Sequence, residues 1–346
     1  MSRSPKYSVI IPCYKAETFL PRTLSSVLAS TLKDIEVICV DDASPDACAA
    51  ILQTFSRRDP RITVISFERN QGVAAARNAG LDAARGEIVG FVDSDDTIER
   101  TLLADVYDNM QKTNADINIM SFKFCKNGVQ YCHNDLEKFM DRYGSDVQNM
   151  NDVDKLTMLD DYCWRLSIRR SFWEKTRTYF PIGIKGSEDQ CFWKPQELMA
   201  ERVSLLNTYG YHYYLHAESL TKNEMSSLET IRGHDELMKR LPAKFHLRLM
   251  EKCCRRIHSF GMQDRYLQNE LKRTYVARIH AKARELGKKN YELESYDYVV
   301  PGLCRIVKTK DKKKIFWGGI PIYKEVCSGN RKKISICGIQ LFSKHL

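Results

Sequence analysis

The sequence has no apolar run that could cross a membrane, because none of its 346 residues lies in a stretch of the roughly 18–20 apolar residues that a transmembrane helix needs. The N-terminal apolar run around Val9–Ile11 is also much shorter than the apolar core of a signal peptide. The twelve cysteines are scattered, and no two are spaced C-x-x-C. We therefore expect free thiols in a reducing compartment, the cytoplasm, rather than a disulfide framework.

Three signatures of common enzyme classes are also missing. The chain has no G-x-G-x-x-G dinucleotide fingerprint, no G-x-x-x-x-G-K-[ST] phosphate loop and no H-E-x-x-H zinc motif. His212 and His216 are four residues apart, but the aromatic run Tyr209–Leu215 is typical of a strand rather than a helix. We therefore do not expect these histidines to bind zinc.

Positive charge is in excess, since 54 Lys and Arg face 44 Asp and Glu, for a net charge of +10. Residues 305–346 hold eleven Lys and Arg against two acids, so this tail carries +9 and the rest of the chain is almost neutral. A nucleic-acid-binding protein is an alternative that only the tail supports, where Phe316, Trp317 and Tyr323 could stack on bases.

The tail contains a repeat with an offset of 19 residues, KKKIFWGGIPIYKE at 312–325 and RKKISICGIQLFSK at 331–344. Two such units are too few for a solenoid, and they predict a β-hairpin. Basic clusters interleaved with Ile, Phe, Trp and Tyr suit an anionic membrane surface, at about 1 kcal/mol per Lys or Arg near the lipid. A hairpin packed on the body with solvated lysines is an equally open interpretation.

The first 120 residues alternate between apolar β-branched runs and helical patterns. The runs predict five strands, at Tyr7–Cys13, Ile35–Val40, Ile62–Phe67, Ile88–Val92 and Ile117–Phe122. Because the runs are apolar throughout, we expect an α/β fold with a mainly parallel sheet between layers of helices. Such sheets bind ligands beyond the carboxyl ends of their strands.

An acidic segment, Asp93-Ser94-Asp95-Asp96, lies where the fourth strand should end. Residues i and i+2 of an extended segment point the same way, so Asp93 and Asp95 should present two carboxylates to the ligand crevice. A cation would relieve their repulsion, and hard oxygen ligands favour Mg²⁺ or Mn²⁺. From the spacing alone, a solvated turn with Asp96 or Thr97 as a helix N-cap is an equally good interpretation.

Three other polar segments follow predicted strands or precede predicted helices. A carboxylate at Asp41-Asp42 can accept hydrogen bonds from a nucleobase or a ribose. Arg77, on the helix after Asn70-Gln71-Gly72, can add donors for a phosphate. In Ser187-Glu188-Asp189, a carboxylate at a helix start can act as a general base. Taken singly, each is more simply a turn, a surface Arg, or a capping Ser with first-turn acids.

Together and in this order, the segments resemble the family 2 glycosyltransferases of the GT-A fold, of the bacterial surface-polysaccharide type. The matching stretches are SVIIPCY at 8–14, VDDAS at 40–44, NQG at 70–72 with ARN at 76–78, DSDD at 93–96 and ED at 188–189. Lys15 replaces the family's usual Asn and Ala43 its usual Gly. A weaker match, YYLHAESLT at 213–221, has Tyr214 where Arg is usual. Trp164-Arg165-Leu166 is similar to the family's Trp-Asn-Lys segment.

The resemblance implies an inverting, metal-dependent transferase and assigns a role to each matching residue. The implied donor-binding residues are Pro12, Tyr14, Asp41, Asp42, Arg77, Asp93, Asp95 and His216, with Asp95 and Asp93 at the metal and Trp164 at the acceptor. Asp189 would be the general base, with Glu188 beside it. The implied cofactor is Mn²⁺ or Mg²⁺, which stabilises the nucleoside diphosphate leaving group.

We expect three regions: a GT-A domain at 1–225, a helical region at 226–304 and the basic tail at 305–346. The expected partners are a nucleotide-sugar, foremost a UDP-sugar, and a glycan or lipid-linked acceptor in surface polysaccharide, lipooligosaccharide or capsule synthesis. The tail could add peripheral contact with the inner membrane, and no nucleic acid is expected. The enzymatic alternative is a nucleotidyltransferase of a sugar phosphate, which would release pyrophosphate.

Overall fold

The computed structural model divides into two compact units, Met1–Leu220 and Thr221–Leu346. It describes residues 4–143, 146–147, 162–184, 187–215, 227–246, 278, 281–282 and 285, and six strands between 295 and 345. Across these ranges, none of the helices is long and apolar enough to span a bilayer.

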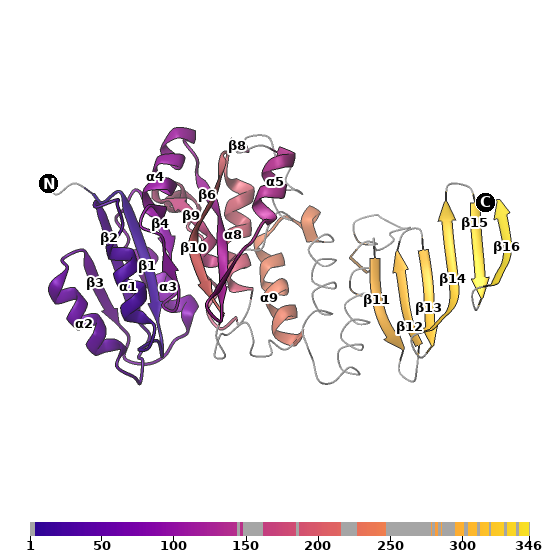
Figure 1. Ribbon diagram of the computed structural model, residues 1–346, viewed down its shortest axis with the longest axis horizontal. Helices are drawn as coiled ribbons and strands as arrows, with labels where there is room; N and C mark the ends of the chain where they lie inside the picture. The colour runs from indigo at the N-terminus through magenta and orange to yellow at the C-terminus, as the bar shows by residue number, and fades with distance from the viewer. Residues whose placement is uncertain are drawn as a thin grey trace. The chain divides into compact units, whose positions relative to one another are not determined.

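The first unit is built on a sheet whose parallel half has the order β3 (Ile62–Ser66), β2 (Ile35–Asp41), β1 (Tyr7–Cys13), β4 (Ile88–Phe91) (Figure 1). Every residue of β1, β2 and β4 is buried, as the fully apolar runs predict. The residues that follow these three strands meet at one edge of the sheet, because neighbouring parallel strands end together.

Beyond β4 the sheet is mixed, with the order β4-β9-β6-β10-β5. The further strands are β9 (Leu166–Arg169), β6 (Ile117–Lys126), β10 (Val203–Tyr214), β5 (Thr97–Ile98), β7 (Val129–Cys132) and β8 (Asp146–Val147). β9 runs antiparallel to both β4 and β6, and β10 runs antiparallel to β5. The sequence did not predict β9 or β5, yet β5 brings β10 beside the acidic segment that follows β4.

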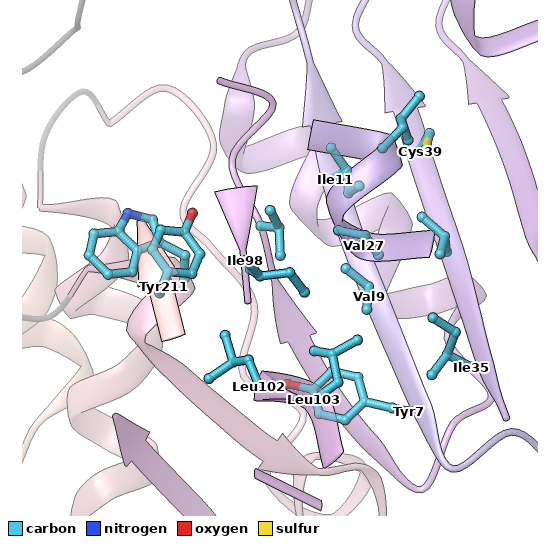
Figure 2. Packing of buried hydrophobic residues seen from close by; sticks show 14 of the residues in the cluster. Tyr7, Val9, Ile11, Val27, Ile35, Cys39, Ile98, Leu102, Leu103 and Tyr211 are labelled. Atoms are coloured by element: carbon cyan, nitrogen blue, oxygen red, sulfur yellow. The ribbon is translucent and has the colours of Figure 1, made fainter. Parts of the chain in front are cut away.

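Helices cover both faces of the sheet, as the apolar strands predict. They are α1 (Leu20–Leu28), α2 (Cys48–Arg58), α3 (Val73–Ala83), α4 (Leu102–Thr113), α5 (Asp135–Tyr143), α7 (Arg170–Thr176), α8 (Glu188–Met199) and the 3₁₀ turn η1 (Cys163–Arg165). Val9 and Ile11 of β1 join the hydrophobic cluster under α1, α2 and α4, and Figure 2 shows Tyr211 at its edge beyond Ile98. Ile10 joins a second cluster with α3 and α8.

The second unit begins with α9 (Ser227–Arg240) and η3 (Ala243–Phe245). Its antiparallel sheet runs in chain order through β11 (Ser295–Val300), β12 (Cys304–Thr309), β13 (Lys312–Trp317), β14 (Ile320–Ser328), β15 (Arg331–Ile336) and β16 (Ile339–His345). β11 therefore falls within the range 226–304 that we expected to be helical. Most of the helical prediction between 247 and 294 lies outside the described residues.

Each repeat unit of the tail is a hairpin by itself, rather than one arm of a single hairpin as predicted. β13 pairs with β14 and β15 pairs with β16. The register shifts between Ile315 and Phe316 in the first hairpin and between Ile334 and Ser335 in the second, which are equivalent positions at the offset of 19. The sequence repeat is thus a repeat of hairpin geometry.

Two of the departures from the family pattern adopt left-handed backbone conformations. Lys15, after β1, has φ 52° and Ala43, after β2, has φ 53°. Asn and Gly, the residues usual in the family at these positions, tolerate this region better than residues with an ordinary Cβ. The two substitutions therefore preserve the turns at a cost in backbone strain.

Replacing Ala43 with Gly should raise the free energy of unfolding by about 1 kcal/mol, because Gly removes the strain of a positive φ. The measurement is urea unfolding of the full chain followed by Trp fluorescence. Ala50→Gly, at an exposed position inside α2, is the matched control and should lower stability by about 1 kcal/mol. Equal shifts in the same direction for both variants would contradict the account of the turn.

Candidate active site

The acidic segment after β4 is held in place by side chains of α1. The guanidinium of Arg22 donates from Nη2 to the carbonyl oxygen of Asp95 at 2.7 Å. Thr23 Oγ1 lies 2.7 Å from the carbonyl oxygen of Asp96 and 2.9 Å from that of Ser94. Through these contacts, α1 fixes the backbone of the acidic segment at the end of β4.

Asp96 ties the same segment to β10. Its buried carboxylate accepts a hydrogen bond from the Tyr211 hydroxyl and another from the Tyr214 backbone N–H, both at 2.8 Å. The Tyr211 oxygen in turn accepts the N–H of Asp93 at 3.2 Å. Burial raises the pKa of Asp96 well above its usual value, and the neighbouring Asp95 and Asp93 raise it further. The helix-cap interpretation is wrong for Asp96, because α4 begins only at Leu102.

Arg77 of α3 brings three carboxylates together from two distant parts of the chain. Its side chain is buried, and Nη1 lies 2.7 Å from Asp189 Oδ1 and 3.7 Å from Glu188 Oε1. Nη2 donates to Asp93 Oδ1 at 3.2 Å. The surface interpretation of Arg77 is therefore wrong. Both terminal nitrogens contact carboxylates. In this structure the guanidinium therefore links α3 to Asp93 and Asp189, and its terminal nitrogens are engaged by these carboxylates rather than directed at a phosphate site.

Asp189 lies in the first turn of α8 with both carboxylate oxygens oriented. Oδ1 contacts Arg77, and Oδ2 accepts the backbone N–H of Cys163 in η1 at 2.9 Å. Burial raises the pKa of Asp189 to about 7; the Glu188 and Asp93 carboxylates also raise it, while Arg77 and the Cys163 N–H oppose the rise. Ser187 precedes the helix at φ 89°, and its side chain makes no capping hydrogen bond. The interpretation of Ser187 as a capping side chain is therefore wrong.

The base-binding residues predicted from the resemblance lie after β1 and β2. Pro12 is buried in β1 opposite Val40, and the Tyr14 ring is exposed. Asp42 accepts the N–H groups of Gln71 and Gly72 at 2.7 and 2.8 Å, while Asp41 accepts the N–H of Ser44 at 3.1 Å. Asp42 thus holds the NQG loop before α3 in this structure, and its contact with a base stays a prediction.

Two further residues predicted from the resemblance are Trp164, at the acceptor, and His216, at the donor. Trp164 is 2% exposed, and its ring is stacked between Tyr211, at 4.1 Å between centroids, and Tyr162, at 5.0 Å. Aromatic neighbours cover both ring faces, so Trp164 supports Tyr211 and has no free face on which an acceptor sugar could stack. His216 lies outside the described residues.

The site carries more negative than positive charge. Three carboxylates, those of Asp93, Glu188 and Asp189, contact the buried guanidinium of Arg77, and Asp95 and Asp96 follow Asp93 in the acidic segment. Over the residues that the structure describes, no group of three His, Cys, Asp or Glu forms a complete metal cage. The donor set nevertheless fits Mg²⁺ or Mn²⁺, which are usually bound by one or two carboxylates together with substrate phosphates. Asp93 and Asp95 are the residues that would hold the ion.

The chain is similar to known proteins in sequence and in fold. Residues 8–175 match the family described as Glycosyl transferase family 2. The chain is 32% identical over 219 residues to the uncharacterized glycosyltransferase EpsJ of Bacillus subtilis, covering 63% of each chain. It is 29% identical over 212 residues to the poly(ribitol-phosphate) beta-N-acetylglucosaminyltransferase TarS of Staphylococcus aureus, covering 60% of this chain and 35% of TarS. The chain thus spans less than two thirds of the length of either relative.

Solved structures share the fold. The S. aureus TarS 1–349 complex with UDP-GlcNAc has a TM-score of 0.56 at 20% identity, covering 90% of this chain and 99% of that one. The mannosyltransferase PcManGT of Pyrobaculum calidifontis, in complex with GDP-Man and Mn²⁺, has a TM-score of 0.52 at 17% identity, covering 82% and 76%. At these identities the likeness shows the fold, and the predicted GT-A class is confirmed.

The raised pKa of Asp189 predicts how stability depends on pH. Because the folded protein binds this proton more tightly than the unfolded chain, whose Asp pKa is about 3.9, stability should fall as pH rises from about 4 to 7. Asp189→Asn should make the fall in the urea midpoint shallower over this interval. The isosteric change Asp108→Asn, at an exposed position of α4, should leave the slope unchanged. Parallel curves for all three proteins would contradict the assignment.

Proposed function

We propose that the chain moves a sugar from a nucleotide-sugar to an acceptor hydroxyl with inversion at the anomeric carbon, because residues 8–175 match the family described as Glycosyl transferase family 2. The observation that supports this proposal best is the arrangement of Asp189. Its carboxylate is oriented through both oxygens and faces the same guanidinium as Asp93 of the β4 segment. A single oriented base beside an acidic donor site is what direct displacement requires.

Asp189 is the proposed general base. A carboxylate with a pKa of about 7 can accept a proton from a sugar hydroxyl near neutral pH better than a fully solvated Asp can. The Cys163 N–H and Arg77 hold it so that proton acceptance needs no rearrangement of the side chain. Glu188, 3.7 Å from Arg77, adds negative charge that keeps the pKa of Asp189 raised.

The donor is proposed to bind at the carboxyl ends of β1, β2 and β4, with a UDP-sugar as the first candidate. Tyr14 would border the base, Asp42, whose carboxylate binds the NQG loop, would contact the base, and Asp93 would contact the ribose. Mn²⁺ or Mg²⁺ held by Asp95 and Asp93 would stabilise the charge of the departing diphosphate. TarS and PcManGT, which share the fold, support a nucleotide-sugar as the donor, since their structures are complexes with UDP-GlcNAc and with GDP-Man and Mn²⁺.

The acceptor is proposed to be a glycan or lipid-linked glycan of a cell-surface polymer. The support is the resemblance to TarS, whose name describes sugar transfer to poly(ribitol-phosphate). The tail at 305–346 is proposed to contact an anionic membrane surface, because its +9 charge is interleaved with aromatic and aliphatic residues.

The transfer assay measures nucleoside diphosphate released from a panel of nucleotide-sugars with Mn²⁺, Mg²⁺ or a chelator. Asp189→Asn should lower transfer by at least about 100-fold while donor binding persists, because only the proton acceptor is lost. Asp95→Asn should lower transfer and also weaken donor binding in the presence of metal, because a proposed ligand of the ion is lost. Asp108→Asn is the control and should match the wild type. Pyrophosphate released in a parallel reaction that supplies a nucleoside triphosphate and a sugar phosphate would instead indicate a nucleotidyltransferase, and full transfer by Asp189→Asn would refute the base.

The membrane proposal is tested by co-sedimentation with liposomes of neutral or anionic lipids. The full chain should pellet with anionic vesicles, and less so as salt rises, because its Lys and Arg side chains attract the lipid headgroups. A variant with Lys312, Lys313 and Lys314 changed to Gln should pellet several-fold less. Equal pelleting of both chains, or equal pelleting with neutral and anionic vesicles, would contradict the proposal.

A further inference from the structure

Arg22 is an exposed cation that contacts the acidic segment after β4. Its guanidinium carbon lies 3.9 Å from the centre of the Tyr214 ring, and Nη2 donates to the carbonyl oxygen of Asp95 at 2.7 Å. Stacking on an aromatic face and one in-plane hydrogen bond together fix the plane of a guanidinium. Arg22 belongs to α1 and Tyr214 to β10, so the side chain is oriented from both sides of the acidic segment.

The guanidinium of Arg22 keeps donors available. A guanidinium has five N–H donors in its plane, and stacking on Tyr214 uses none of them. Within the described part of the chain, the bond to Asp95 is the one hydrogen bond that Arg22 makes. The remaining N–H groups can therefore form the two-pronged contact with phosphate oxygens for which the guanidinium geometry is suited.

Arg77, the other guanidinium of the site, is not available in this way. It is buried at 5% exposure and both of its terminal nitrogens contact carboxylates. A diphosphate that took Arg77 would leave Asp189 and Asp93 without their partner, and an unpaired buried charge is strongly unfavourable. Besides the metal ion proposed at Asp93 and Asp95, Arg22 offers positive charge to a diphosphate directly beside Asp95.

We propose that Arg22 binds the diphosphate of the nucleotide-sugar and of the nucleoside diphosphate product, a role that sequence analysis gave to Arg77. The inference rests on the proposed function, because it names the residue that recognises the donor's phosphates at that same site. Arg22 also occupies the region that an Arg at position 214 would reach, since its guanidinium lies over the Tyr214 ring. The positive charge thus comes from α1 instead of β10.

The test is binding of UDP and of uridine to the full chain in the presence of Mn²⁺, by calorimetry for UDP and NMR titration for uridine. Arg22→Gln should weaken UDP binding by about 10- to 100-fold, the loss expected for a charge-assisted contact with phosphate. Uridine binding should change less than about twofold, because uridine has no phosphate. Arg22→Lys should fall between wild type and Gln, since Lys keeps the charge without the fork. If the wild type prefers GDP, the pair becomes GDP and guanosine.

Two further variants complete the test. One is a control for the loss of an exposed positive charge, and the other tests phosphate binding without the hydrogen bond from Arg22 to Asp95. Arg58→Gln, an exposed Arg at the far end of α2, should change neither affinity. Arg22→Gln combined with Tyr214→Arg should regain at least about tenfold in UDP affinity, because it returns a guanidinium to the same region. Unchanged UDP binding by Arg22→Gln, equal loss of UDP and uridine, or no recovery in the double variant would overturn the inference. A wild-type chain that binds no nucleoside diphosphate would instead refute the proposed function.

Discussion

The buried guanidinium of Arg77 is the interaction on which the rest of the site depends. It connects α3, the segment after β4 and the first turn of α8, which are up to 112 residues apart in the chain. Without this cation the carboxylates of Asp93, Glu188 and Asp189 would repel one another in a poorly solvated space. Loss of one partner from such a buried network typically costs about 3–5 kcal/mol. The positions of Asp189, the proposed base, and of Asp93 in the acidic segment are therefore set by the same side chain.

The sequence predicted the parts of the fold that repeat a local pattern. The strands at Tyr7–Cys13, Ile35–Asp41 and Ile88–Phe91 are fully buried, and uninterrupted apolar runs are the local signature of that state. β9 and β5 were not predicted, because they have four and two residues and depend on partners distant in sequence. For the tail, the sequence predicted the repeat and a hairpin, but not that each repeat unit forms a hairpin of its own. That pairing depends on where the chain reverses.

In the site, too, local features were predictable from the sequence and contacts between distant residues were not. The placement of Asp93 and Asp95 after β4 and of Asp189 at the start of α8 followed from strand ends and helix starts, which are local features. The contacts of Arg77, Tyr211 and Arg22 did not, because they join residues between 16 and 192 positions apart. Burial also changed roles. Trp164 proved to be enclosed between two rings, and both Asp42 oxygens were engaged by the NQG loop.

The sheet of the second unit has a consequence for how this region can change in evolution. Its strands pair in chain order, so each hairpin is a short, self-contained segment whose pairing needs no distant residue. The 19-residue offset, with its register shift at the same place in both copies, is the mark of a duplicated segment. Tandem gain or loss of one hairpin would lengthen or shorten the sheet while leaving the other strands in register. The number of basic residues in the tail can therefore change in discrete steps, independently of the first unit.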